Sequence, residues 1–564
     1  MCGIIAYLGA GNAVERVVNG LKDLEYRGYD SAGVAAIVGK RIKTVKSVGH
    51  VRALCDKISA HEIASNIAIG HTRWATHGGV SEKNCHPHVS ANGRIAVVHN
   101  GIIENYRELR AELEHENIAF KTDTDTEVIP NLIQHILGIG RDLLGAVRRA
   151  VPRLHGSYAF LVIDAGDPET IIAVKNGSQP LVITVQNGDV FVSSDTPTAT
   201  ANGGAVYVLE DGEMATLRRD SVTFYMNGKC VVKKPLAITT TPAKPSKEGY
   251  ATFMEKEIRE IPTVVANIEG AYRGRNLHPL RGRIFESSCV HLVACGTSFH
   301  ACLYIANLLE ARGTRARCYV ASEFLHTRPH ITDRDVAIVI SQSGETADTL
   351  LAMKMLKGRG IYTAAICNVE ASSIWRYADV ALPTVAGVEV AVASTKAFIA
   401  QCLVGEILVN GGILEGVLVC GKAIIDRRAD LVDLVKRHGD AKKIFFLGKG
   451  VTTIVAMESA LKVKEITYRH CEGIAAGELK HGTLALVDDK TLCIFLLSND
   501  EIANGKIENA MHEVAARGAR VHVLPASVGI MSVIYAQLFA LDLCLSVGLD
   551  PDKPRNLAKS VTVD

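Results

Sequence analysis

The sequence predicts an α/β protein in which a strand-rich amino-terminal part precedes two doubly wound domains built on parallel sheets. Three features of the chain lead to this prediction. Residues 1–233 alternate short strands with short helices, whereas after residue 250 strands alternate with longer helical patterns. Between them, residues 234–250 are rich in proline, threonine and lysine, which is typical of a linker. The part after the linker also repeats its pattern at about the length of a domain.

The amino-terminal part contains short or alternating apolar runs separated by glycine-rich turns, the pattern of strands in packed sheets. The runs that we expect to form strands are Gly3 to Leu8, Ser31 to Val38, Ile95 to His99, Ser157 to Ile163 and Asp189 to Ser193. We therefore expect a first domain of packed sheets over residues 1–233.

The repeat after the linker consists of a strand, a polar loop, a helix and a second strand. This pattern occupies residues 335–367 in the first copy and 491–525 in the second. We place the first α/β domain at residues 251–425, the second at 426–555 and a carboxyl-terminal tail at 556–564.

Composition excludes several classes of protein. A formal net charge of +2 over 564 residues shows no bias toward nucleic acid or an anionic membrane surface. The fourteen cysteines include no C-x-x-C pair, so we expect reduced thiols rather than disulfides or a zinc site. No apolar stretch reaches the length of a membrane span, and no signal peptide is recognisable. We expect a cytoplasmic protein with no nucleic-acid or membrane partner.

A hydroxyl-rich loop, residues 341–346 (SQSGET), follows a buried strand in the first copy. Backbone N–H groups at a helix start, with short hydroxyls around them, make an anion site at the sheet edge where doubly wound domains bind ligands. An ordinary Ser or Thr helix cap is the alternative. No Walker lysine follows, which favours a sugar monophosphate over a nucleoside triphosphate. In the second copy, Asp500 and Glu501 stand in this place and would repel a phosphate.

Cys2 becomes the first residue if Met1 is removed. An amino-terminal cysteine carries a thiol and an α-amine on one residue. The amine, with a pKa of about 7.7–8.0, can act as general base for the thiol, which would then be a nucleophile. The alternative is that Cys2 is a small residue that opens a strand.

The motifs around Cys2 resemble those of the class II, or N-terminal nucleophile (Ntn), glutamine amidotransferases. They are CGII at 2–5, YRGYDSAG at 26–33, HTRWATHG at 71–78, HNG at 99–101 and TDTE at 124–127. The resemblance implies an αββα sandwich for the first domain and Cys2 as the catalytic nucleophile.

The same resemblance implies a glutamine site. Arg73 would hold the α-carboxylate and Asp125 the α-ammonium, as their charges suit. Asn100 and the Gly101 N–H would form the oxyanion hole. The remaining residues that the family places at the glutamine site are Trp74, Thr76 and His77.

Two other interpretations apply to parts of this constellation. Asn100-Gly101 can be a tight hairpin turn, and both interpretations can hold because a turn glycine lets the backbone approach a ligand. The four histidines at positions 71, 77, 86 and 88 invite a metal site, but their spacing fits neither H-E-x-x-H nor a zinc finger. We expect no metal.

The part after residue 250 resembles paired sugar isomerase (SIS) domains. The motifs are CGTS at 295–298, SQSGET at 341–346, VASTK at 392–396, the run 458–465, GELKHG at 477–482 and PRNLAKSVTV at 554–563. The resemblance implies a sugar-phosphate site, and the residues it assigns there are Thr297, Ser298, Ser341, Gln342, Ser343, Thr346, Val392 and Ser394.

The SIS resemblance also implies four catalytic residues. Glu465 would move a proton between the first two sugar carbons, and Lys462 would support that transfer. His481 would assist ring opening, and Lys559 would meet the open-chain carbonyl as an amine. The alternatives are an exposed helix ion pair for Lys462 and Glu465, and a frayed tail for Lys559.

Taken together, the motifs resemble the amidotransferase family that makes an amino-sugar phosphate for hexosamine synthesis. The implied reaction converts D-fructose 6-phosphate and L-glutamine to D-glucosamine 6-phosphate and glutamate, with ammonia crossing internally past Trp74. It implies no metal or organic cofactor, and a homodimer that shares His481. A sugar-phosphate isomerase or deaminase with a decayed glutaminase, and a non-catalytic sugar-phosphate sensor, stay open as alternatives.

Two departures from the family pattern are visible. Thr483 stands where many relatives have proline, which makes the loop that presents His481 less rigid. The chain is also short after Val523, which puts the last strand of the second α/β domain in doubt.

Overall fold

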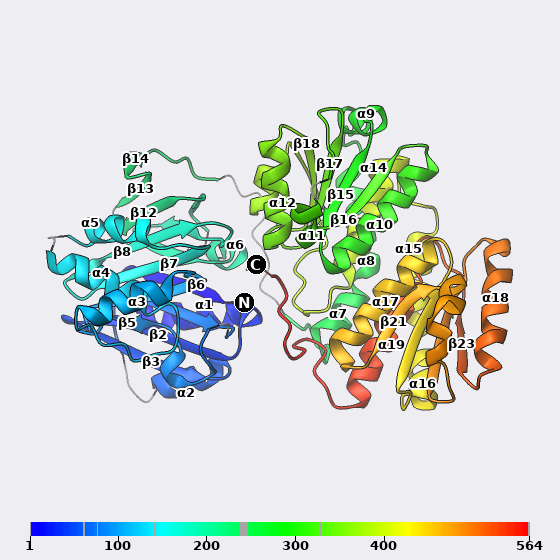
Figure 1. The fold of residues 1–564 in the computed structure, drawn as a ribbon, viewed down its shortest axis with the longest axis horizontal. Coiled ribbons are helices and arrows are strands. Elements are labelled where there is room, and N and C mark those ends of the chain that lie inside the picture. The colour runs from blue at the N-terminus through cyan, green and yellow to red at the C-terminus, as the bar shows by residue number, and fades with distance from the viewer. Residues whose placement is uncertain are drawn as a thin grey trace. The chain divides into compact units, whose positions relative to one another are not determined.

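The computed structural model describes residues 2–59, 63–75, 77–139, 142–201, 203–219, 221–236, 246–327 and 329–561. The chain divides into two compact units, Met1–Lys244 with Ser560–Asp564, and Pro245–Lys559 (Figure 1). Each unit is described by itself. Most of the predicted linker, residues 237–245, lies outside the described residues.

The first sheet of the amino-terminal unit has seven antiparallel strands. Their spatial order is β11 (Ala205–Val208), β9 (Val182–Gln186), β10 (Asp189–Ser193), β1 (Gly3–Leu8), β4 (Ile67–Arg73), β2 (Ser31–Val38) and β3 (Arg41–Val48). Strand β1 lies at the centre of the sheet, and this fixes Cys2 at the strand's end. The predicted strands at residues 3–8, 31–38 and 189–193 are confirmed.

The second sheet of this unit is also antiparallel and seven-stranded. Its order is β14 (Lys229–Val231), β13 (Ser221–Met226), β12 (Glu213–Arg218), β8 (Asp167–Asn176), β7 (Tyr158–Asp164), β6 (Ile95–Gly101) and β5 (His88–Val89). The predicted strands at 95–99 and 157–163 are confirmed, with ends shifted by one or two residues.

Apolar side chains of the two sheets pack face to face, and helices cover both outer faces. Helices α1 (Ala13–Leu24) and α2 (Val51–Ser59) bury their apolar sides on the first sheet. Helices α3 (Tyr106–His115), α4 (Val128–Ile139) and α5 (Leu143–Ala150) do so on the second. The core between the two sheets is formed by the side chains that point inward from each sheet. The predicted αββα sandwich is confirmed. Short segments complete the unit: α6 (Thr196–Thr200) and the 3₁₀ turns η1 (Glu25–Arg27), η2 (Glu82–Asn84) and η3 (Val151–Arg153).

The carboxyl-terminal unit contains two parallel sheets. The first has five strands in the order β16 (Ala316–Val320), β15 (Val290–Ala294), β17 (Val336–Ser341), β18 (Tyr362–Cys367) and β19 (Val380–Pro383). Its helices are α10 (Gly296–Ala311), α11 (Ala321–Thr327), α12 (Ala347–Gly358) and α13 (Ser373–Tyr377). The strand order reverses between β15 and β17, which is where such sheets bind ligands.

The second sheet has four parallel strands, β21 (Cys471–Ala475), β20 (Lys443–Gly448), β22 (Thr491–Leu496) and β23 (Arg520–Leu524). Helix α17 (Val451–Thr467), the turns η4 (Ala476–His481) and η5 (Thr483–Leu486), and α18 (Glu501–Ala515) connect them. After β23 the described chain enters helix α19 (Val533–Ser546) without a fifth strand. The strand doubted from the sequence is therefore missing from the described residues.

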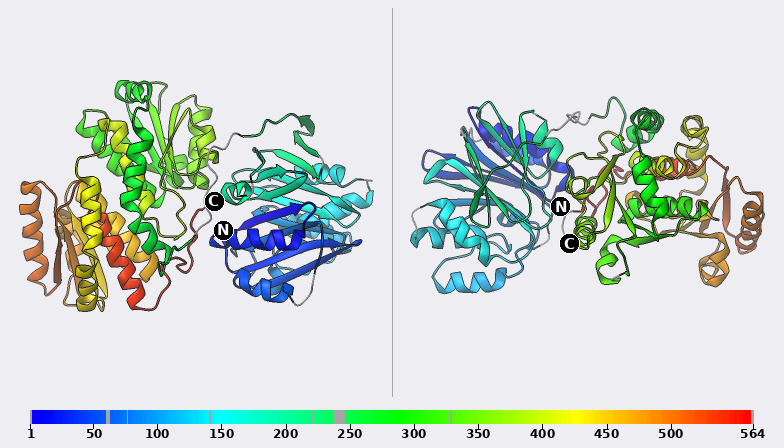
Figure 2. Two further views of the ribbon diagram at one scale, coloured as in Figure 1. Left: turned by 180° about the vertical axis from the view of Figure 1, so that it is seen from behind. Right: turned by 90° about the horizontal axis from the view of Figure 1, so that it is seen from above.

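A layer of buried helices joins the two sheets into one core. It includes α10, α14 (Lys396–Asn410), α17 and α19, and all but one residue of α14 is fully buried or nearly so. Figure 2 shows α19 in red beside α16 (Arg428–His438) and α17, in agreement with their packing. The remaining helices are α7 (Phe253–Arg259), α8 (Ile261–Tyr272), α9 (His278–Glu286), α15 (Val417–Asp426) and α16 (Arg428–His438).

All fourteen cysteines are free thiols. Within the ranges described above, the helices are too short or too polar to cross a membrane.

Candidate active sites

The end of strand β1 brings Cys2 against the residue that follows strand β4. The backbone N–H of Trp74 donates to the Cys2 Sγ at 3.4 Å, and the Sγ lies 3.5 Å from the Trp74 carbonyl oxygen. Burial raises the pKa of the Cys2 thiol. The thiol is therefore protonated at neutral pH and needs a base before it can attack a carbonyl.

Asn100 and Gly101 face Cys2 from the end of strand β6. The Asn100 Nδ2 donates to the Cys2 carbonyl oxygen at 3.1 Å. Gly101 has φ of +113°, and a Cβ there would meet the Ser157 carbonyl oxygen at 2.1 Å, so only glycine fits. The hairpin interpretation is wrong, because both residues belong to β6 and Gly101 pairs with Tyr158 of β7.

Arg73 and Asp125 are both nearly buried, but other groups already hold them. The Arg73 guanidinium donates to the carbonyl oxygens of His77, at 2.5 Å, and Gly78, at 2.8 Å. The Asp125 carboxylate accepts from the Ile103 N–H at 2.9 Å. In this state Arg73 therefore closes the loop after β4, and a glutamine carboxylate would share or replace these bonds.

Two further residues predicted for the glutamine site are only partly placed. Trp74 packs edge-on against Tyr29, with ring centroids 5.5 Å apart. His77 packs edge-on against Tyr106 at 5.8 Å. Thr76 lies outside the described residues.

Three histidines of this unit, His71, His86 and His88, pack their rings together. The rings of His71 and His86 lie parallel at 4.0 Å, and His88 meets His86 edge-on at 4.5 Å. Burial lowers the pKa of all three below the ordinary value, so they are neutral. Over the described residues, no three His, Cys, Asp or Glu side chains converge as metal ligands. His77 is not part of the stack.

In the carboxyl-terminal unit, the loop Ser341–Thr346 lies at the carboxyl end of β17, between β17 and α12. The Ser341 Oγ accepts from the Gly344 N–H at 2.9 Å and lies 3.1 Å from the Thr346 Oγ1. Gly344 has φ of +66°, and a Cβ there would collide with Ser372. Thr346 is the N-cap of α12, but its side chain makes no capping bond, so the helix-cap interpretation fails. The hydroxyls face a helix start that a phosphate could use.

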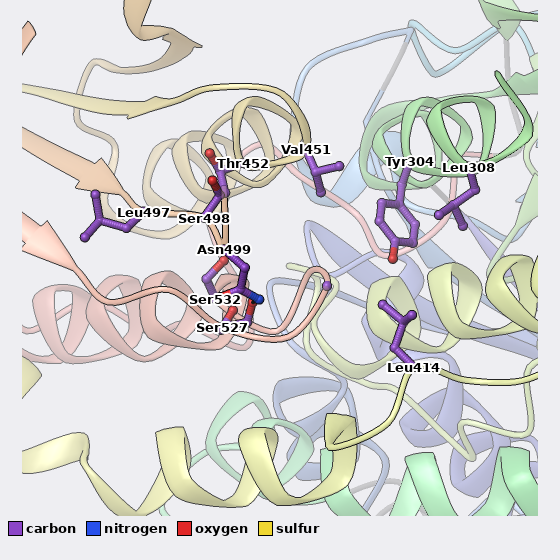
Figure 3. A pocket seen from close by; sticks show the side chains of 11 residues that line it. Tyr304, Leu308, Leu414, Val451, Thr452, Leu497, Ser498, Asn499, Ser527 and Ser532 are labelled. Carbon is purple, nitrogen blue, oxygen red and sulfur yellow. Dashed lines mark hydrogen bonds between the residues drawn. The ribbon is translucent and has the colours of Figure 1, made fainter. Parts of the chain in front are cut away.

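The equivalent edge of the second sheet differs. The Asp500 carboxylate accepts from the N–H groups of Ile502 and Ala503 at 2.9 and 3.1 Å, and it thereby fills the start of α18. A pocket beside it is lined by apolar and uncharged polar groups, among them Tyr304, Leu308, Leu414, Val451, Thr452, Leu497, Ser498 and Asn499 (Figure 3). These side chains offer no positive charge to an anion, and the Asp500 carboxylate at the start of α18 would repel one.

Helix α17 carries three charged residues on one face. The Lys462 Nζ lies 2.7 Å from the Glu465 Oε2 and 3.2 Å from the Glu458 Oε1, and its side chain is fully buried. Lys462 also donates to the Thr297 Oγ1 at 3.0 Å, and the His300 Nδ1 lies 2.6 Å from the Glu458 carboxylate. The exposed-pair interpretation of Lys462 and Glu465 is therefore wrong.

These contacts give the two carboxyls different pKa values. Burial raises the pKa of Glu465, and the Lys462 charge opposes this only in part. For Glu458, burial is outweighed by Lys462 and His300, and its pKa is lowered. Burial lowers the pKa of Lys462, but the two carboxylates raise it by more. The Lys462 ammonium therefore stays charged. A carboxyl with a raised pKa beside a fixed cation is suited to accepting and returning a proton.

Lys559 is held inside the unit rather than in a frayed tail. Its Nζ forms an ion pair with the Glu389 Oε2, and its side chain is 5% exposed. The same Oε2 accepts from the Ser394 Oγ at 2.9 Å. The Lys559 charge also acts on the Glu465 carboxyl and lowers its pKa slightly, so the two clusters are in electrostatic range.

The other predicted sugar-site residues are less closely joined. The Ser298 Oγ accepts from Gln401 at 3.0 Å, and the Val392 N–H donates to the Asp552 carbonyl oxygen at 3.2 Å. Gln342 follows Ser341 on the loop described above. His481 ends η4, is exposed, and makes no recorded bond to the Lys462 cluster.

Sequence reasoning missed Glu389, His300 and the role of Glu458. An acid inside the apolar run VEVAVA was a signal for Glu389, because a buried carboxylate requires a cation or several donors. For Glu458, the spacing of four residues before Lys462 was a signal. His300 had no signal, since its partner lies 158 residues away.

Residues 284–411 and 439–528 match the model of the SIS domain family, and residues 71–201 match that of the glutamine amidotransferase domain. The fold and sites thus define an amidotransferase joined to paired SIS domains. Proteins called glutamine–fructose-6-phosphate aminotransferase (isomerizing) from Symbiobacterium thermophilum, Acinetobacter baylyi and Caldanaerobacter subterraneus are 40%, 39% and 37% identical to this chain over the whole of both sequences. The chain belongs to this enzyme family.

A solved structure supports the assignment of the carboxyl-terminal unit. The C-terminal domain of glucosamine-fructose-6-phosphate aminotransferase from Francisella tularensis is 31% identical, with a TM-score of 0.51, over 55% of this chain and all of that one.

Proposed function

We propose that this chain transfers the amide nitrogen of L-glutamine to D-fructose 6-phosphate and isomerises the product to D-glucosamine 6-phosphate. The observation that carries the proposal is the presence, in one chain of this family, of two complete sets of reactive groups. Cys2 lies beside Asn100, and the ion pair between buried Lys462 and Glu465 lies on α17. A decayed glutaminase would not keep the first set, and a sugar sensor would not need the second.

The first half-reaction is hydrolysis of the glutamine amide at Cys2. With Met1 removed, the α-amine takes the thiol proton, and the sulfur attacks the side-chain carbonyl carbon. Asn100 Nδ2 and the Gly101 N–H stabilise the oxyanion, while Arg73 and Asp125 hold the α-carboxylate and α-ammonium. Ammonia leaves, and water then cleaves the glutamyl thioester to release glutamate.

The second half-reaction takes place in the carboxyl-terminal unit. Ser341, Ser343 and Thr346 bind the phosphate of fructose 6-phosphate, and His481 assists ring opening. Ammonia condenses with the C2 carbonyl and water leaves. Glu465 removes a proton from C1 and returns one to C2, while the O1 hydroxyl proton is transferred to the nitrogen, which yields the 2-amino aldose. No step requires a redox change.

Four other residues assist the sugar chemistry. Lys462 lies next to Glu465 and keeps a positive charge beside the proton in transit, and Thr297 accepts a hydrogen bond from Lys462 and helps to hold it. Ser394 and Lys559 both contact Glu389, and this fixed position supports the proposal that Lys559 meets the open-chain carbonyl as an amine.

The test is incubation of the purified protein with glutamine and fructose 6-phosphate, with glutamate and glucosamine 6-phosphate measured together. Equal amounts of the two products support the proposal. Glutamate without amino sugar, or isomerised sugar without glutamate, would contradict it and would favour an isomerase with a separate hydrolase activity.

We also propose that the enzyme is a homodimer in which His481 serves the neighbouring subunit. Its exposed position at the end of η4 favours this arrangement, because an exposed side chain can reach a neighbouring subunit. Mixing an inactive His481→Ala chain with an inactive Glu465→Gln chain should restore activity if the site is shared, and should leave it absent if it is not.

A further inference from the structure

The Asn100 side chain is held from two sides, and one of its partners has no assigned role. Its Nδ2 donates one hydrogen to the Cys2 carbonyl oxygen, at 3.1 Å. Its Oδ1 lies 3.1 Å from the His71 Nε2. The second Nδ2 hydrogen is the one left for an oxyanion, so the direction of this amide decides whether the oxyanion hole exists.

The surroundings of His71 determine which of its nitrogens carries the proton. The His71 Nε2 also lies 2.9 Å from the His99 carbonyl oxygen, which can only accept. Nε2 must therefore be the protonated nitrogen, and it shares its hydrogen between the His99 carbonyl and the Asn100 Oδ1. Its Nδ1 is buried with no hydrogen-bond partner among the described residues.

The ring has no freedom to change this arrangement. His71 is fully buried and stacks on His86 at 4.0 Å with an interplanar angle of 13°. Burial lowers the pKa of His71 to about 3, so the imidazole stays neutral across the physiological range. A neutral ring with a fixed N–H is a directional donor that carries no charge toward the thiol.

We propose that His71 is a positioning residue for glutamine hydrolysis, which fixes the Asn100 amide with its N–H groups toward the reacting carbon. If the Asn100 amide were rotated by about 180°, its Oδ1 would face the oxyanion and repel it. The arrangement resembles the way a buried partner sets the orientation of a catalytic ring in other hydrolases. This inference rests on the proposed amidotransferase function and assigns a part to a residue that does not touch the substrate.

The test compares two substitutions of similar shape. His71→Gln places an amide N–H near the position of Nε2, whereas His71→Met has no donor. We expect His71→Met to lower the kcat of glutamine hydrolysis by about 10- to 100-fold, less than the 10²–10³ that follows loss of an oxyanion donor. The KM for glutamine should change little, since Arg73 and Asp125 bind the amino acid. His71→Gln should recover most of the rate.

Three controls separate positioning from damage to the fold. His88→Met removes another buried imidazole of the stack that makes no bond to Asn100, and its kcat measures the effect of the cavity alone. Alkylation of Cys2 by iodoacetamide, read by mass spectrometry of the amino-terminal peptide, needs no oxyanion hole and should proceed at the wild-type rate in His71→Met. Isomerisation of fructose 6-phosphate should also be unchanged.

The inference is overturned if His71→Gln is as slow as His71→Met, if His88→Met loses as much, or if the loss lies in KM. If His71→Met no longer melts cooperatively, His71→Asn takes its place, because its shorter amide cannot reach Asn100. Wild-type protein that releases no glutamate would instead contradict the proposed function itself, before His71 is considered.

Discussion

The hydrogen bonds made directly to Cys2 are neutral, whereas the direct partners of Lys462 include two carboxylates that form ion pairs with it. Cys2 bonds to the Asn100 amide and to the Trp74 backbone, and Asn100 in turn contacts the uncharged His71 ring. At Lys462 one buried ammonium lies between the fully buried Glu458 carboxylate and the Glu465 carboxylate, whose side chain is 20% exposed. The difference suits the chemistry that we propose for the two sites. Charge appears only briefly during amide cleavage, and preformed dipoles stabilise it, whereas moving a proton between carbons requires a titrating group throughout.

Cys2→Ala should produce the largest effect. Without the sulfur no thioester forms, so glutamine-dependent synthesis should be lost entirely, while isomerisation of fructose 6-phosphate and synthesis from added ammonia should remain. Coupled assays for glutamate and glucosamine 6-phosphate measure both. A chain that retains Met1 should behave in the same way, because the base is then missing. Cys230→Ala, which removes an exposed thiol, is the matched control. Glutamine use by Cys2→Ala would disprove the nucleophile assignment.

Glu465→Gln tests the ionic site. The substitution keeps the shape but cannot accept a proton, so turnover of the sugar should fall by roughly 10²–10⁴-fold with little change in the KM for fructose 6-phosphate. Glutamine hydrolysis should survive at its basal rate. Glu501→Gln, on the exposed start of α18, is the control. If Glu465→Gln turned over normally, the proton would have to travel through another group.

The two copies of the α/β sheet allow a sharper test of phosphate binding. Each hydrogen bond to a charged group is worth about 1.5–3 kcal/mol, so replacing Ser343 or Thr346 by Ala should raise the KM for fructose 6-phosphate by at least about tenfold. The kcat should change much less. Ser498→Ala, at the equivalent edge of the second sheet, should leave both constants unaltered. Equal effects from the two loops would show that the copies share the phosphate.

The smallest effect should come from Glu257→Gln and should appear in stability. Burial and the neighbouring Glu389 raise the pKa of Glu257 to about 8, from an ordinary value near 4.3. The folded chain therefore keeps a proton that the unfolded chain loses as the pH rises through about 4. This contribution to stability is complete below that pH and is lost progressively up to about pH 8. Gln cannot lose the proton, so the variant's Tm should exceed that of the wild type at pH 8 but not at pH 4.5.

Calorimetry at a series of pH values measures this difference. The bonds that Glu257 accepts from Val390 and Ala391 use one oxygen, which the amide retains. A Tm difference that stayed constant from pH 4.5 to pH 8 would show that Glu257 titrates normally in the folded chain.

The sequence predicted the elements that local patterns determine. Apolar runs bounded by turn residues located β1, β2 and β10 to the residue, because most of these strand ends adjoin glycine, serine or charged residues. The Asn100-Gly101 dipeptide wrongly indicated a hairpin turn. Gly101 pairs with Tyr158, which lies 57 positions farther on, and the intervening helices give no local sign of this pairing. The limits of the two α/β domains at 251–425 and 426–555 stay a prediction.

The candidate sites show the same division. Motifs located Cys2, Asn100 and the loop 341–346, but not what surrounds them. Burial of Lys462 depends on Thr297 and Glu458 together, and only the fold brings the first of these to helix α17. The orientation of Asn100 likewise depends on a histidine 29 residues away. Residue types can be recognised in a sequence, whereas the groups that tune them come from tertiary packing.

Asp552 has a consequence for how the chain could be shortened or extended. Its carboxylate accepts from the N–H groups of Phe253 and Met254, both at 2.8 Å, and so caps helix α7. Its carbonyl oxygen accepts from Val392 at 3.2 Å. Lys559 follows seven residues later, so its ammonium is positioned from a fixed anchor and not by a helix of its own. Closing so short a segment costs little conformational entropy. A tag fused after residue 564 leaves this anchor in place, whereas any insertion between Asp552 and Lys559 would lengthen the tether and move the amine away from Glu389.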